Sequence, residues 1–388
     1  MDNITFVECF GSIPDKRIDR TKEHILLDII AIVLFAIMSG AQTFEEIEQF
    51  GELHLVWLKQ YLLLPNGIPS HDTIRRVLGF LDHQQLITCF IDWITRVKGL
   101  VKENVVAIDG KTMKGSHARG KGVKALHVLS AYSCANGLSL GQLKVDGKTN
   151  EIVVIPELVK QLAISGAIVT IDAMGCQKDI VQAIIAQKAD YIIAVKENQK
   201  ELYETITDVF NLAKTKEYAS KMPIEKFEDE IESSHGKIEQ RFVTTLPLSS
   251  VAHAVNPDEW VGIKSIAKIQ RRAENKNGEV AIEDRYFISS IAHTEAKTIG
   301  RSARLHWGIE NKLHWTLDVA FKEDDCRIRD EVAALNFAWF RKMALSFLSP
   351  VEPFGKKVNS IKKKMLRNWA RPDGIIEYIN PVHTPEVI

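Results

Sequence analysis

The spacing of apolar residues changes at Gly99, and this change limits the fold more than any other feature of the chain. From about Thr21 to Lys98 apolar residues recur with the period of an amphipathic helix, as in TFEEIEQFGELHLVWLKQYL. After Gly99 they form short runs rich in β-branched residues, bounded by Gly, Asn and Asp. We therefore expect an all-helical N-terminal domain at residues 1–98, followed by a part that contains a sheet.

The runs after Gly99 predict a mixed sheet of the α/β (α+β) class. Three come first without helices between them and suit hairpins, whereas the later AIVTIDAMGC and ADYIIAVKEN alternate with helix-like segments such as QKDIVQAIIAQK. Such alternation packs helices on the faces of a sheet. We divide this part into a first core segment (99–206), a β-rich insertion (207–296), a helical segment that completes the core (297–348) and a basic C-terminal segment (349–388).

Composition indicates an ordinary globular protein in a reducing compartment. The 388 residues are 45% hydrophobic and 26% charged, which is near the average for globular domains. The five cysteines form no CxxC pair, so free thiols and a cytoplasmic location are expected. The strongest apolar run, from Ile25 to Gly40, contains Asp28 and is shorter than a membrane span, so we interpret it as a buried core helix.

The charge balance requires any anionic partner to bind a local basic patch. Lys plus Arg and Asp plus Glu are both 50, so the whole chain has no net field to attract it. One candidate patch runs from Arg96 to Lys124. Another is Arg75 and Arg76, which follow a helix cap at Ser70 and resemble the start of a helix-turn-helix recognition helix. A solvated basic face is the alternative at both places.

Two aspartates each follow a hydrophobic run, Asp109 in VVAIDGK and Asp172 in IVTIDAMG. We expect each to end a strand. In α/β sheets ligands gather beyond strand ends, although Asp is also a common residue for leaving a strand. The repetition favours a shared site.

A third acid, Glu310, lies within HWGIENKLHW. It belongs to a row of four residues spaced four apart, which predicts one face of a helix: His306, Glu310, His314 and Asp318. The two histidines are roughly 12 Å apart along such a helix, too far for one zinc ion, and no HExxH motif is present. A solvated amphipathic helix is the alternative. Three carboxylates from separate elements, however, suit Mg²⁺ and a phosphodiester substrate.

Four motifs together carry a family resemblance: IDGKTMKGS, TIDAMGCQKDI, YIIAVKENQ and HWGIENKLHWTLDVAFKEDDCRIR. They resemble the insertion-sequence DDE transposases, in the branch that includes the H-repeat-associated proteins. The resemblance covers nearly the whole chain and implies a ribonuclease-H-like core whose catalytic and metal-binding acids are Asp109, Asp172 and Glu310. It also implies two Mg²⁺ ions, with Mn²⁺ as a substitute, and a homodimer on double-stranded DNA. The expected location is the bacterial cytoplasm, at the nucleoid, without a membrane partner.

The implied activity is cleavage of transposon-end DNA followed by strand transfer into target DNA. We expect the DNA contacts to come from Lys111, Lys114, Lys196, His306, Asn311, Arg75 and Arg76. The wider family often has Tyr and Arg before the Glu and Lys after it, where this chain has Ala303, His306 and Leu317. Two alternatives stay open: a DNA-binding remnant without strand transfer, and a metal-dependent nuclease without joining activity.

Overall fold

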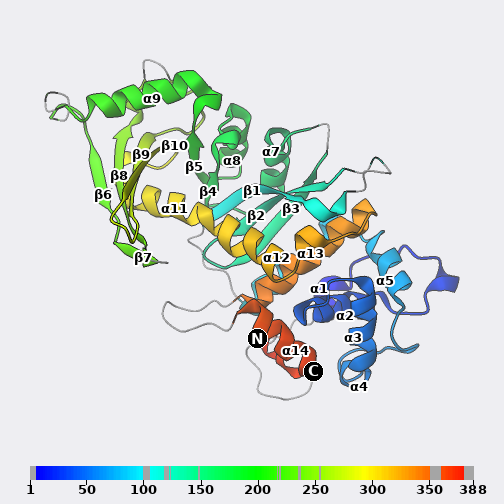
Figure 1. The fold of residues 1–388 in the computed structure, drawn as a ribbon. Coiled ribbons are helices and arrows are strands. Elements are labelled where there is room, and N and C mark those ends of the chain that lie inside the picture. The colour runs from blue at the N-terminus through cyan, green and yellow to red at the C-terminus, as the bar shows by residue number, and fades with distance from the viewer. Residues whose placement is uncertain are drawn as a thin grey trace.

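A ten-stranded mixed sheet forms the centre of the molecule, with helices on both faces and the helical N-terminal region packed at one end (Figure 1). The computed structural model describes residues 6–98, 105–117, 122, 124–146, 149–215, 217, 220–234, 237–252, 255–349 and 360–379. The expected class, a mixed sheet with flanking helices and a helical N-terminal region, is confirmed.

The N-terminal region consists of helices, as its apolar period predicts. They are α1(Phe6–Phe10), α2(Leu26–Met38), α3(Phe44–Leu53), α4(Leu55–Leu58), α5(His71–Leu78) and α6(His83–Lys98), with the 3-10 turn η1(Asp19–Thr21) between α1 and α2. Every residue of α2 except Leu27 is buried, so the interpretation of the apolar run as a core helix is confirmed. In the part of the chain that the structure describes, no helix combines the length and apolarity needed to cross a membrane.

The first half of the sheet has the strand order β3-β2-β1-β4-β5. Its strands are β1(Val105–Met113), β2(Leu126–Ser133), β3(Leu138–Val145), β4(Ile168–Ile171) and β5(Asp190–Val195). β1, β2 and β3 pair antiparallel as the expected hairpins, and β4 lies parallel between β1 and β5. This is the mixed arrangement that a ribonuclease-H-like core requires.

The β-rich segment continues the same sheet. Its strands are β6(Glu225–Glu228), β7(Glu232–Ser234), β8(Lys237–Pro247), β9(Ser265–Glu274) and β10(Val280–Ser289). β10 pairs antiparallel with β5, with Tyr286 opposite Val195. The predicted boundary at 207 falls inside α9(Lys200–Leu212), so regular core structure extends a few residues further than the sequence pattern indicates.

The two faces of the sheet are covered by different helices. One face carries α7(Glu151–Gln161), α8(Lys178–Ala186) and α9. Against the other lie α11(Ala296–Gly308), η8(Ile309–His314), α12(Trp315–Val319) and α13(Glu331–Leu348), and the chain continues to α14(Ile361–Ala370) and α15(Asp373–Ile379) (Figure 1). η8 is π-helical, which corrects the expectation of a regular α-helix around Glu310. Further 3-10 turns are η2(Lys114–Ser116), η4(Ala173–Gly175), η5(Glu197–Gln199), η6(Leu248–Ser250), η7(His293–Glu295) and η9(Glu323–Asp325).

One hydrophobic core joins the N-terminal helices to the sheet. It contains buried residues of α2, α3, α5 and α6 together with Ala107 of β1, Tyr132 of β2 and most apolar residues of α13. Ring contacts cross the same boundary, such as Phe44 against Phe337 with centroids 5.4 Å apart. The sheet face that carries Ala107 also carries Asp109, because alternate residues of a strand share a face. The N-terminal helices therefore pack against the strand that carries Asp109, and so support it.

Candidate active site

Asp109 lies within β1 and not at its end, which corrects the expectation from the sequence. β1 continues to Met113 because its pairing with β2 continues that far. Its parallel partner β4, however, stops at Ile171, opposite Ile108. The next residue of each strand is an aspartate, so Asp109 and Asp172 lie side by side where the parallel pairing ends.

Asp172 leaves β4 and begins the short turn η4. Its Oδ1 accepts a hydrogen bond from the backbone N–H of Met174 at 3.0 Å. The turn therefore fixes the start of this side chain at the sheet edge, and Asp172 itself remains exposed there.

Two residues of the row around Glu310, His306 and His314, contact β4 and β1, which the spacing alone did not predict. His306 Nδ1 lies 3.1 Å from Thr170 Oγ1 of β4, and His314 Nδ1 lies 3.4 Å from Asp109 Oδ2 of β1. Glu310, exposed, lies between the two histidines on the same stretch. A π-helical segment is a local widening that often marks functional sites. Here it contains Glu310, whose charge acts on Asp109.

The electrostatics of the site centre on Asp109. Burial, together with the negative charges of Asp172, Glu151 and Glu310, raises the pKa of Asp109 to about 7, against the lowering effect of a backbone hydrogen bond at Gly110. Burial also lowers the pKa of His306, against the opposing effect of Asp172. His306 is therefore neutral at pH 7, because even its unshifted pKa lies below that pH. The acids near Asp109 therefore repel one another, and no Lys or Arg of the described residues forms an ion pair with Asp109.

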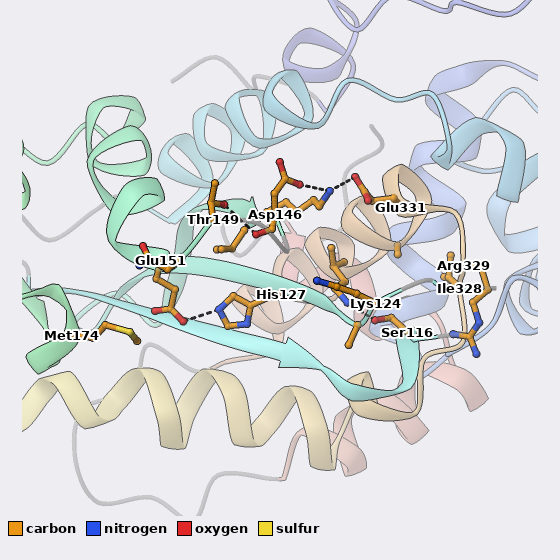
Figure 2. Close-up of a pocket in the computed structure, with 17 residues that line it drawn as sticks. Ser116, Lys124, His127, Asp146, Thr149, Glu151, Met174, Ile328, Arg329 and Glu331 are labelled. Carbon is orange, nitrogen blue, oxygen red and sulfur yellow. Dashed lines mark hydrogen bonds and ion pairs between the residues drawn. The ribbon is translucent and has the colours of Figure 1, made fainter. Parts of the chain in front are cut away.

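A fourth acid at this place, Glu151, was missed by the sequence analysis. It is the first residue of α7, and its Oε1 lies 2.6 Å from Nε2 of His127, whose Nδ1 is 2.7 Å from Thr112 Oγ1 (Figure 2). A Cβ built on Gly110 would lie 2.2 Å from that same Glu151 oxygen, so a side chain there would require Glu151 and His127 to shift. Glycine directly after the aspartate was the one available signal of this close approach.

A cavity of about 560 Å³ extends from this fourth acid along β2 and β3. Met174, two residues beyond Asp172, lines one end of it together with Glu151 and His127, and Arg329 lines the other (Figure 2). Its charged side chains are mixed in sign, since Lys144 pairs with both Asp146 and Glu331. The cavity is a groove beside the site and not a uniformly basic channel.

Lys111, expected to contact phosphate, is surrounded by acids of its own chain. Its Nζ lies 2.5 Å from Asp318 Oδ1, 3.0 Å from Glu323 Oε2 and 3.4 Å from Asp324 Oδ1. A phosphate would have to displace these carboxylates. The geometry therefore gives Lys111 a structural role and corrects its expected place among free phosphate contacts.

The other expected contact residues lie at the surface. Lys114 also pairs with Asp324, at 3.0 Å, but its side chain is 81% exposed. Lys196 is exposed directly after β5, and Asn311 is exposed directly after Glu310. Arg75 and Arg76 are exposed on α5, where Asp72 accepts a hydrogen bond from each. In the candidate patch from Arg96 to Lys124, three basic residues lie outside the described residues: Lys102, Arg119 and Lys121.

The donor chemistry of Asp109, Asp172 and Glu310 fits a hard divalent cation, because all three offer carboxylate oxygens. The raised pKa of Asp109 agrees with this, since a cation would relieve the mutual repulsion that raises it. Within the described residues, no three His, Cys, Asp or Glu side chains are already gathered into a metal site. Side-chain movement is therefore needed to bring the three carboxylates onto one ion.

Comparison with known families agrees with this geometry. The Transposase DDE domain family matches residues 100–347, which contain all three acids, and the family described as DDE_Tnp_1-associated matches residues 7–94. The chain belongs to the DDE transposases. The transposase is 39% identical over 374 residues to the H repeat-associated putative transposase YhhI of Escherichia coli K12, covering 94% of this chain and 96% of YhhI. The expected branch is thereby confirmed.

Two further relatives from Escherichia coli K12 show that similarity of sequence does not by itself establish activity. The putative protein YbfL is 40% identical over 374 residues, covering 94% of the transposase and 96% of YbfL. The inactive transposase YbfQ is 51% identical over 66 residues, covering 17% of the transposase and 79% of YbfQ. The family acts on DNA, but its members include one named inactive, so activity has to be argued from the residues of each chain.

Proposed function

We propose that this transposase cleaves DNA at the ends of its element and joins the freed 3′ hydroxyl to target DNA. Asp109, Asp172 and Glu310 are the catalytic acids. The observation that supports this most is the strand register: β4 ends one residue before Asp172, exactly level with the residue before Asp109. The contacts of His306 with β4 and His314 with β1 then hold Glu310 over the same edge.

The same acids are the proposed ligands of Mg²⁺, with Mn²⁺ as a substitute and two ions in the active complex. Bound ions of this kind activate an attacking oxygen and stabilise a leaving one in phosphodiester chemistry. Asp109 contributes a further property. Because its pKa is about 7 without a cation, it has to give up a proton when it becomes a ligand, so metal binding near neutral pH is coupled to proton release.

DNA would be held by exposed groups around the acids. Lys196 and Asn311 are exposed next to the strand end and to Glu310, Lys114 begins the turn η2 after β1, and Arg75 and Arg76 extend the contact surface to the N-terminal helices. His306 is neutral at pH 7, so it would reach a phosphate only through an N–H. We propose a homodimer on DNA, as the resemblance implies, in the cytoplasm at the nucleoid.

Two other functions use the same fold. A DNA-binding remnant has one specific observation in its favour, the named inactivity of the relative YbfQ. The presence of all three acids in this sequence opposes it here. A nuclease without joining activity needs the same ions and differs only in which oxygen is positioned for attack.

The deciding assay uses purified protein, Mg²⁺ and labelled DNA that carries the flanking ends of its own element. Asp109→Asn should lower nicking and joining by about 1,000-fold or more, because metal-assisted charge stabilisation contributes several kcal/mol to the transition state. Its affinity for the ends should be kept, since it removes a negative charge that faces DNA. Asp208→Asn, at an exposed position on α9, is the matched control and should leave both properties unchanged.

The three functions give different results in this assay. Unmutated protein that binds the ends but cuts nothing with Mg²⁺ or Mn²⁺ is a remnant. Protein that nicks without joining is a nuclease.

A further inference from the structure

Among the basic side chains of the described residues, only that of His314 comes within ion-pair distance of an Asp109 carboxylate oxygen. Its Nδ1 lies 3.4 Å from Asp109 Oδ2, and the His314 side chain is 12% exposed against 25% for Asp109. The contact spans from η8 to β1, so it ties the segment that carries Glu310 to the strand that carries Asp109. It is therefore placed where a small shift would change the spacing of two proposed metal ligands.

The two nitrogens of this imidazole have opposite surroundings. Nδ1 faces a carboxylate oxygen, whereas Nε2 is buried without a hydrogen-bond partner among the described residues. A neutral imidazole has a single N–H. A hydrogen on Nδ1 would face Asp109 Oδ2 across the 3.4 Å contact, whereas a hydrogen on Nε2 would have no acceptor among the described residues.

A buried cluster of charged side chains acts on His314. Lys342 of α13 is 3% exposed and donates to Gln142 Oε1, and Glu323 is 2% exposed and pairs with Lys111. The charges of Lys342, Lys111 and Glu323 all act on His314.

Packing alone gives no reason for an imidazole at this position. Leu313 and Leu317, its neighbours on the same stretch, are buried at 1% and 0% exposure and already fill the core. An unpartnered buried nitrogen costs stability, and an apolar side chain of similar size would avoid that cost. The contact that offsets it is the one with Asp109.

We propose that His314 is a positioning residue that holds the Asp109 carboxylate in the orientation needed to bind the divalent cation. This inference rests on the proposed function, in which Asp109 is a metal ligand. Groups that hold the ligands of a metal typically change its affinity by about 10–100-fold when removed. The role differs from catalysis, because His314 acts through Asp109 and not on the DNA.

The test measures Mn²⁺ binding to the intact protein by calorimetry, separately from DNA cleavage. Asparagine places its amide N–H close to where Nδ1–H lies, whereas glutamine places it at the position of Nε2. His314→Asn should therefore bind Mn²⁺ within about threefold of the unmutated protein, and His314→Gln should bind about 10–100-fold more weakly. His314→Leu, which keeps the bulk without a donor, should behave like His314→Gln. If the leucine variant does not fold, the difference in Mn²⁺ affinity between His314→Asn and His314→Gln still tests the inference.

The outcomes separate this inference from the proposed function. If all three variants bind Mn²⁺ like the unmutated protein while their melting temperatures fall, His314 only packs the core and the inference is wrong. Equal weakening by Asn and Gln also overturns it, because the position of the donor would not matter. If the unmutated protein itself binds no Mn²⁺, the proposed metal site fails, and the positioning role fails with it.

Discussion

Two clusters of charged residues lie two residues apart on the same face of β1, and they differ in balance. Around Lys111 the acids Asp318, Glu323 and Asp324 share a buried cation. Around Asp109 the acids Asp172, Glu151 and Glu310 gather with no Lys or Arg ion pair among the described residues. We call these the paired cluster and the unpaired cluster. The comparison teaches that the number of acids does not distinguish the two clusters; whether a Lys or Arg of the described residues compensates them does.

The largest expected effect comes from unbalancing the paired cluster. Lys111→Met leaves Glu323 buried at 2% exposure without the cation with which it forms an ion pair. Breaking one partner of a buried pair typically costs about 3–5 kcal/mol, so the free energy of unfolding should fall by about that amount, with or without Mg²⁺. Chemical denaturation measures it. Lys111→Met combined with Glu323→Leu should recover a large part of the loss, and a double variant as unstable as the single one would show that the pair itself is unimportant.

The next effect belongs to the unpaired cluster, which a divalent cation should stabilise. At a Mg²⁺ concentration 100 times the dissociation constant, binding to the folded state alone adds about 2.7 kcal/mol. A thermal melt with and without Mg²⁺ should show this gain in the unmutated protein and lose it in Asp172→Asn. Asp318→Asn removes an acid from the paired cluster and should keep the gain. Equal Mg²⁺ responses in the two variants would mean that the clusters do not differ in function.

The smallest effect is a pH dependence of stability without metal. The pKa of Asp109 is about 7 in the folded protein, compared with its usual 3.8. The folded state therefore binds more protons between these values, and its stability falls as pH rises through that window. After discounting for partial exposure, Asp109 should account for about 1–3 kcal/mol of this fall.

Asp109→Asn has no titrating group at this position and isolates the effect. Unfolding free energies of the two proteins, measured in metal-free buffer from pH 4 to 8, should diverge as pH rises, with the variant the more stable above pH 7. His314, with its lowered pKa of about 3, acts in the opposite direction: its contribution is lost as pH falls below 6.5, in both proteins. If the two curves of unfolding free energy against pH ran parallel, ionisation of Asp109 would not destabilise the folded state.

Local patterns in the sequence predicted the helices and strands of the fold but not every pairing between strands. The apolar run at α2, the hairpins β1 to β3 and the row through Glu310 follow from periodicity within a few residues of chain. The extension of the sheet through β10 does not, because β10 joins β5 across a long stretch of sequence. Strand pairing of this kind depends on the whole sheet and leaves no periodic signal.

The candidate site divides in the same way. Asp109 and Asp172 could be predicted as neighbours because each follows a run of hydrophobic residues in the sequence, although β1 continues past Asp109. The partners of Lys111 were not, because they lie more than 200 positions away in the chain. Neither were Glu151 and His127, which meet beside Gly110, where a side chain would require them to shift. Side chains whose role depends on partners distant in sequence are the ones that sequence analysis misassigned or missed.

The core that joins α2 to α13 also has a consequence for how the protein is made. α2 is buried almost completely, and residues of α13 belong to the same core. A ribosome adds about 5–20 residues per second, so roughly 15–60 seconds pass between the synthesis of α2 and that of α13. During this interval the nascent chain presents an apolar helix that lacks its cover. Chaperones that bind such helices should therefore associate with the growing polypeptide until its last third has emerged.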